Sequence, residues 1–169
     1  IAKQGANHVI FRTSWVYGTE GDNFAKTMLR LAQEREKMTV IHDQFGAPTG
    51  AALLADITAT ALQAQHRLTG IYHLAAAGET TWYGLSRLVV QTALDAGAAL
   101  KVHPSAIKPI PAMEYPLPAP RPMNSRMSTD KLRKVFEGRG DMSKLQLLNQ
   151  PWDEAVRSYV RNLAKDGLI

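Results

Sequence analysis

Apolar and polar positions along this 169-residue chain follow two periods, one typical of buried strands and one typical of amphipathic helices. Short apolar, β-branched runs predict strands at residues 8–13, 38–41 and 71–74. Between the first two, Phe24, Met28 and Leu31 recur at helical spacing behind Asn23, a residue suited to cap a helix. Strands that alternate with helices in this way indicate an α/β fold with a partly parallel sheet.

Further helices are expected in the second half of the pattern. Residues 51–65 predict one helix, and a second begins after Thr80 or Thr81, carries Trp82 on its apolar stripe and ends at Gly97. Residues 101–110 leave the choice between strand and loop open. Ser128 is expected to cap a short helix that residues 138–140 break, and a last helix begins with Pro151 in its first turn.

The opening of the chain predicts a piece of a larger fold. Residues 1–8 lack a methionine and have the character of a helix end closed by Gly5, with a strand directly after it. Three or four strands are also few for a doubly wound sheet. We therefore expect residues 1–169 to be a fragment of a larger fold.

The most unusual stretch is Tyr115-Pro-Leu-Pro-Ala-Pro-Arg-Pro-Met-Asn-Ser-Arg-Met127. Alternating prolines fix φ and exclude both helix and interior strand, so they predict a stiff, extended loop. Arg121 and Arg126 are carried on it. A guanidinium group on a rigid backbone suits recognition of a phosphate or carboxylate, although solvated loop arginines are an equally good interpretation.

Composition narrows the function classes. A net charge of +5 favours an anionic partner, but the basic residues are not interleaved with aromatic ones and form no nucleic-acid-binding motif. No apolar run is long enough to span a membrane, and the absence of cysteine fits a cytoplasmic protein. The five histidines have no metal-ligand spacing, and no serine lies in a nucleophile elbow. Two glycines at 18 and 21 are too few to indicate a phosphate-binding loop.

Four motifs occur in order: residues 11–18 (Phe-Arg-Thr-Ser-Trp-Val-Tyr-Gly), 23–29 (Asn-Phe-Ala-Lys-Thr-Met-Leu), 43–49 (Asp-Gln-Phe-Gly-Ala-Pro-Thr) and the proline stretch through Arg126. Together they resemble the C-terminal portion of the dTDP-4-dehydrorhamnose reductases, a family of extended short-chain dehydrogenase/reductases. The resemblance covers essentially the whole chain. It implies a partial Rossmann-like α/β fold that lacks the N-terminal dinucleotide-binding half.

The resemblance also implies an activity. Enzymes of this family use NADPH or NADH to reduce the C4 ketone of dTDP-4-dehydro-L-rhamnose, with a tyrosine as proton donor. This sequence contains neither the glycine-rich loop nor the Tyr-x-x-x-Lys pair, and we expect both to lie upstream of Ile1. The chain alone is therefore expected to be inactive and to hold no catalytic residue. A homodimer is compatible with the resemblance.

What remains is the substrate side of the site. By resemblance, Trp15 contacts the sugar nucleotide, although a core tryptophan is the competing interpretation. Asn23 and Lys26 at a helix N-terminus, and Arg121, Asn124 and Arg126 in the proline loop, are the other expected substrate-binding residues, with the arginines facing the diphosphate.

Two alternatives stay open. One is a non-catalytic relative similar to the regulatory β subunit of methionine adenosyltransferase. The other is a sugar-nucleotide epimerase or dehydratase of the same superfamily.

Overall fold

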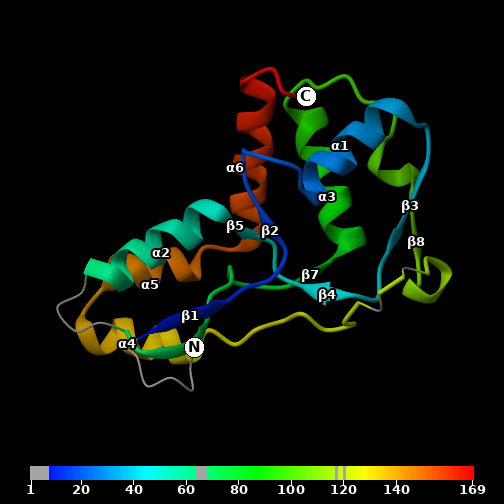
Figure 1. Cartoon of the computed structure of the whole chain (residues 1–169). Coiled ribbons are helices and arrows are strands. Elements are labelled where there is room, and N and C mark those ends of the chain that lie inside the picture. The colour runs from blue at the N-terminus through cyan, green and yellow to red at the C-terminus, as the bar shows by residue number, and fades with distance from the viewer. Residues whose placement is uncertain (1–7, 64–67, 117, 120) are drawn as a thin grey trace.

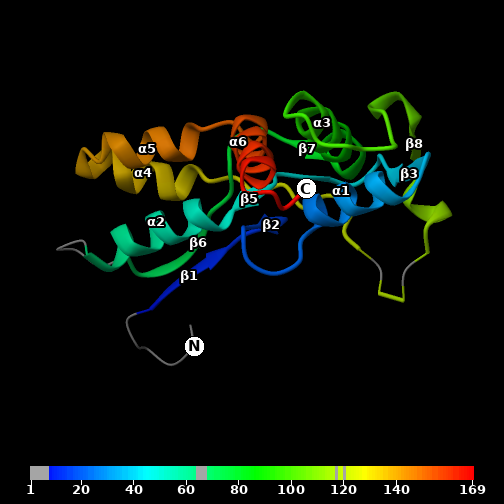
Figure 2. The same cartoon turned by 90° about the horizontal axis from the view of Figure 1, so that it is seen from above.

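The computed structural model describes residues 8–63, 68–116, 118–119 and 121–169. Its helices form two groups on either side of the long helix α6 (Trp152–Lys165), as both views show (Figures 1 and 2). Each group has its own cluster of buried apolar side chains. The predicted α/β class is confirmed, but the strands form four separate pairs in place of one continuous sheet.

The first group is built on a parallel pair of strands. β1 (Val9–Arg12) pairs with β6 (Gly70–His73), with Val9 opposite Gly70. Three helices pack with this pair: α2 (Ala51–Gln63), α4 (Asp130–Arg139) and α5 (Met142–Asn149). Ile57, Leu74, Leu132, Phe136 and Leu148 are fully buried at its centre. Burying apolar surface of this kind is the main stabilising contribution to the fold.

The second group carries the larger cluster. α1 (Phe24–Glu34), α3 (Trp82–Asp95) and α6 pack together beside a second parallel pair, β3 (Met38–Ile41) and β8 (Ile107–Ile110). Leu29, Val89, Val90 and Val160 are completely enclosed there. The strand left undecided at residues 101–110 is thus β8. It tolerates Pro109 because it pairs only with β3 in the described structure.

Short strands connect the two groups. β2 (Val16–Tyr17) pairs in parallel with β5 (Thr49–Gly50), and β4 (Phe45–Gly46) pairs antiparallel with β7 (Thr80–Thr81). The proline-rich segment then passes from the end of β8 back to α4 below β4 and β7 (Figure 1). The described residues of this segment thus lead from the second group of helices to the first.

Helix caps account for most correct boundaries. Asn23 and Thr81 cap α1 and α3 through their side chains, as predicted. Ser128 was the wrong choice for α4, because Thr129 is the N-cap and Ser128 Oγ accepts only from the amide of Asp130 at 3.3 Å. The predicted break at 138–140 is confirmed, since α4 runs to Arg139 and ends where Gly140 adopts φ 71°. The predicted ends at Gly5 and Gln65, and residues 117 and 120 of the extended stretch, lie outside the described residues.

Candidate functional site

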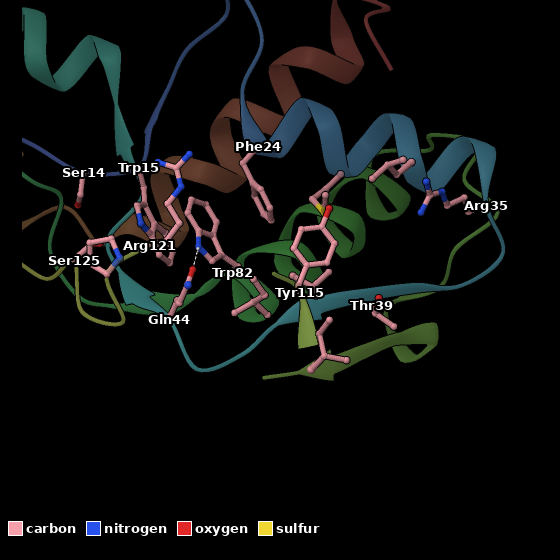
Figure 3. Close-up of a pocket in the computed structure, with 16 residues that line it drawn as sticks. Ser14, Trp15, Phe24, Arg35, Thr39, Gln44, Trp82, Tyr115, Arg121 and Ser125 are labelled. Carbon is pink, nitrogen blue, oxygen red and sulfur yellow. Dashed lines mark hydrogen bonds between the residues drawn. The ribbon is translucent and has the colours of Figure 1, made fainter. Parts of the chain in front are cut away.

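The main cavity of the described structure has a volume of about 640 Å³ and lies between α1, the β3–β8 pair and the proline-rich segment (Figure 3). α1 contributes Phe24, Met28 and Leu31, so part of its apolar stripe lines this space as well as packing on the core. Backbone positions along β3 and β8 complete the apolar surface. A cavity of this size, apolar with a few polar groups, has the character of a small-molecule site.

An aromatic stack forms one end of the cavity. The rings of Trp15 and Trp82 lie parallel within 14°, with centroids 3.6 Å apart, and the ring of Phe24 lies 4.4 Å from that of Trp82. The indole Nε1–H of Trp82 donates to Oε1 of Gln44 at 3.2 Å (Figure 3). The apolar stripe of α3 predicted from the sequence includes Trp82, and the ring does pack against the core cluster, but at the start of the helix it also lines the cavity.

Local backbone geometry brings Trp15 to this position. Trp15 has φ 51°, a left-handed conformation that is uncommon for a bulky residue and costs on the order of 1–3 kcal/mol. Its carbonyl accepts from the amide of Thr49 at 3.1 Å. Gly46 makes the close approach possible, because a Cβ atom there would lie 2.5 Å from Cε2 of Trp15. The strand end, the β2–β5 pair and this glycine therefore position the ring together.

The proline-rich segment forms another side of the cavity and is tied to the fold near both ends. At its start the amide of Ala112 donates to Asp43 Oδ1 at 2.9 Å. At its end Phe45 donates to the carbonyl of Met123 at 2.9 Å, and Ser125 donates to the carbonyl of Phe45 at 2.7 Å. Tyr115, Arg121, Pro122 and Ser125 of the segment line the cavity. The tripeptide Asp43–Phe45 thus anchors the segment that carries Arg121.

Two guanidinium groups give the cavity its charge. Arg121 lies beside Trp15 and Trp82, and Arg35 lies at the opposite end of the lining (Figure 3). Within the described part of the chain, neither guanidinium forms a hydrogen bond or ion pair. No aspartate or glutamate lines the cavity. An anion next to an apolar or aromatic group would therefore suit it.

Arg126 and Asn124 are held differently from Arg121. Arg126 donates to Glu79 and to Oδ1 of Asn124, both at 2.9 Å, and its guanidinium carbon lies 5.4 Å from the centre of the Phe45 ring. Neither Asn124 nor Arg126 lines the cavity, whereas Ser125 between them does. Their contacts therefore fix the end of the proline-rich segment.

Asn23 and Lys26 also lie outside the cavity. Asn23 Oδ1 accepts from the amide of Lys26 at 3.1 Å, and its Nδ2 donates to the carbonyl of Gly18 and to the hydroxyl of Tyr159. The ammonium group of Lys26 donates to the carbonyls of Thr19 and Gly21. A phosphate at this helix end would have to compete with these contacts. The structure thus brings Trp15 and Arg121 together and leaves Asn23 and Lys26 apart from them.

The same contacts hold the glycine-bearing turn at residues 18–21. The turn at residues 18–21 is the glycine-bearing strand-to-helix turn closest to a phosphate-binding loop, but its carbonyls and the following helix end are engaged by Lys26 and Asn23. A dinucleotide loop requires amides that are free to face the phosphates. Asn23 and Lys26 therefore hold this turn through its carbonyls, and the turn lacks the third glycine of a dinucleotide-binding loop.

Tyr17 and Tyr159 form a pair of tyrosines outside the cavity. The rings of Tyr17 and Tyr159 lie 4.9 Å apart in the core beside α1. Burial, with a smaller contribution from Tyr159, raises the pKa of Tyr17 to about 12, and burial also raises the pKa of Tyr159. A tyrosine that donates a proton to a ketone needs a lowered pKa. Neither residue has the properties of that acid.

The described part of the chain contains no group of three or more histidine, aspartate or glutamate side chains placed to hold a metal ion. Its helices include none long and apolar enough to cross a membrane.

Comparisons with known proteins place these features in a family. Residues 1–164 match the family model described as the RmlD substrate binding domain. The dTDP-4-dehydrorhamnose reductase of Escherichia coli (strain K12) is 53% identical over 134 residues, which cover 78% of this chain and 44% of that protein. The chain thus spans about half the length of the curated relatives it matches.

Solved structures agree with the family match. The dTDP-4-dehydrorhamnose reductase of Bacillus anthracis, in complex with NADP, is similar with a TM-score of 0.71 and 30% identity, over 90% of this chain and 47% of that one. The orthologue from Clostridium acetobutylicum gives a TM-score of 0.75 and 26% identity over 92% of this chain and 48% of its own.

Proposed function

We propose, from the premise that this chain belongs to the RmlD substrate-binding domain family, that it supplies the sugar-nucleotide side of a dTDP-4-dehydrorhamnose reductase. In this proposal the whole enzyme reduces the C4 ketone of dTDP-4-dehydro-L-rhamnose to give dTDP-L-rhamnose. NADPH or NADH supplies the hydride when bound. Its binding loop and the Tyr-x-x-x-Lys pair do not occur in this sequence, so we assign them to the part of the reductase outside residues 1–169.

The observation that carries the proposal is the pairing of Trp15 and Arg121 in one cavity. A deoxysugar presents an apolar face that packs well on an indole ring, and the adjacent diphosphate is an anion that a guanidinium fork can bind through two oxygens. Arg121 has no protein partner among the described residues, and Trp15 is half-buried, so the part of its indole that Trp82 and Gly46 leave uncovered can contact the sugar. The apolar stretch from Phe24 toward Tyr115 then accommodates the nucleoside.

The other predicted site residues receive supporting roles in this proposal. Asn124 and Arg126 hold Ser125 at the edge of the cavity. Asn23 and Lys26 hold the turn at residues 18–21 and the start of α1. Direct contact with the sugar nucleotide is thus assigned to Trp15 and Arg121.

Two matched arginine variants test the proposal. Arg121→Lys keeps the charge but loses the fork, so the affinity of the chain for dTDP-L-rhamnose should fall about tenfold, which corresponds to ~1.4 kcal/mol. Arg126→Lys makes the same change at the other arginine of the proline-rich segment, which is paired with Glu79. It should lower the melting temperature more than the affinity. The measurements are calorimetric titration and thermal melting of both variants.

The opposite pattern would contradict the proposal. If Arg121→Lys binds as the wild type does and melts at a lower temperature, Arg121 is structural. If a UDP-sugar binds as tightly as dTDP-L-rhamnose, the cavity belongs to another kind of sugar-nucleotide enzyme.

A further inference from the structure

Gln44 is a buried polar side chain that lines the cavity. It is only 6% exposed, and its Oε1 accepts the single N–H of the Trp82 indole at 3.2 Å. Indole has no other hydrogen-bonding group, so this contact fixes the rotation of the ring within its plane. The flanking residues Asp43 and Phe45 are themselves tied to the proline-rich segment, which makes Gln44 part of a rigid backbone.

Trp82 passes this orientation on to Trp15. The two rings are stacked 3.6 Å apart, at the contact distance of aromatic planes, and Phe24 packs on Trp82 at 4.4 Å. Trp15 cannot rotate without losing the stack or meeting the backbone at Gly46. Its own backbone at φ 51° is unfavourable for a tryptophan and needs support from neighbouring contacts.

We propose that Gln44 is a positioning residue for the Trp15 ring, acting through the hydrogen bond to Trp82 and the indole stack. This inference rests on the proposed function for the part that Trp15 plays toward the sugar. It makes Gln44 and Trp82 determinants of affinity although only Trp15 meets the sugar ring. The competing view is that Gln44 merely fills space beneath the cavity.

The chain offers a direct test, because it contains three tryptophans and therefore three indole N–H resonances in an ¹⁵N-labelled sample. Trp152, in α6, serves as the internal reference. In Gln44→Met, which keeps the length but removes the acceptor, the Trp15 resonance should move toward its position in Trp82→Ala, where the stack is absent. Gln44→Glu keeps an acceptor oxygen and should restore the wild-type Trp15 resonance.

A matched control excludes a general effect of the substitution. Gln91→Met makes the same change on α3, where the Gln91 side chain donates to Asp95 at 2.8 Å, and should leave the Trp15 resonance in place.

Loss of one hydrogen bond of this class weakens binding by about threefold to tenfold, so Gln44→Met should lower the affinity for dTDP-L-rhamnose by that factor.

The outcomes separate this inference from the proposed function. A Trp15 resonance that stays at its wild-type position in Gln44→Met overturns the positioning role, whatever the affinity. If the wild-type chain does not bind dTDP-L-rhamnose, the proposed function fails. The Trp15 resonance then still decides whether Gln44 positions the ring: a shift supports it and an unchanged resonance refutes it.

Discussion

Gly46→Ala is the smallest change that should disturb the candidate site. The added Cβ would lie 2.5 Å from Cε2 and 2.8 Å from both Cδ2 and Cζ2 of Trp15. Carbon atoms pack best at about 3.5–4.0 Å, so the ring must retreat by roughly an ångström. The indole of Trp82 already lies 3.6 Å from it, so the retreat must slide or compress the stack.

The cost follows from this overlap. Overpacking a well-packed site destabilises a protein by about 1–3 kcal/mol, and in a chain of this size each kcal/mol lowers the melting temperature by about 2–4 °C. Gly46→Ala should therefore melt several degrees below the wild type. It should also bind dTDP-L-rhamnose more weakly, because the displaced ring is the proposed sugar contact. Thermal melting and calorimetric titration measure the two effects.

Gly138→Ala is the matched control. Gly138 lies within α4, and a Cβ there would have nothing within 4 Å. Alanine is the better helix former, so this variant should be more stable than the wild type by about 0.5–1 kcal/mol with unchanged affinity. If Gly46→Ala melts at or above the wild-type temperature, the packing argument for Trp15 is wrong.

Three further predictions follow from other contacts. Asn23→Ala should lower the free energy of unfolding by about 1–2 kcal/mol because it removes the cap of α1, whereas Asn23→Asp should lower it less. If the affinity for dTDP-L-rhamnose falls tenfold in both variants, Asn23 is instead a ligand contact. The Tyr17 pKa is raised from 10.0 to about 12, so its contribution to stability is complete below pH 10 and falls as the pH rises toward 12, because the unfolded chain loses the proton first. Urea unfolding across this pH range should show a loss of unfolding free energy on the order of 2 kcal/mol, and Tyr17→Phe should reduce that loss. An equal loss in the variant would contradict the assignment. The purified chain should not oxidise NADPH in the presence of dTDP-4-dehydro-L-rhamnose, since it lacks the Tyr-x-x-x-Lys pair, and measurable turnover would require an acid among its own residues.

Local signals predicted the longer elements well. α1 was visible because its apolar spacing and its cap, Asn23, agree, and β3 was visible because a β-branched run stands between charged and polar residues. The two-residue strands β2, β4, β5 and β7 have no period that a sequence could display, and pairing partners far along the chain create them. α5 was missed because its apolar residues, among them Leu145, Leu147 and Leu148, form no clear stripe.

The candidate site was predictable only in part. The proline-rich stretch indicated Arg121 and Arg126 equally, since the acidic partner of Arg126, Glu79, lies 47 residues away in sequence. Tyr115 opens that stretch and could have been included on the same signal. Gln44 and Trp82 carried no signal for their hydrogen bond, which joins residues 38 positions apart. Such contacts depend on tertiary packing that local patterns do not encode.

The most direct test of the sugar-nucleotide assignment is a crystal structure of the full chain with dTDP-L-rhamnose. We expect electron density for the ligand in the cavity between α1 and the proline-rich segment, with the sugar against the ring of Trp15 and the diphosphate within hydrogen-bonding distance of the Arg121 guanidinium. Density for the ligand elsewhere on the chain, or a diphosphate bound by Asn23 and Lys26 with this cavity empty, would contradict the assignment.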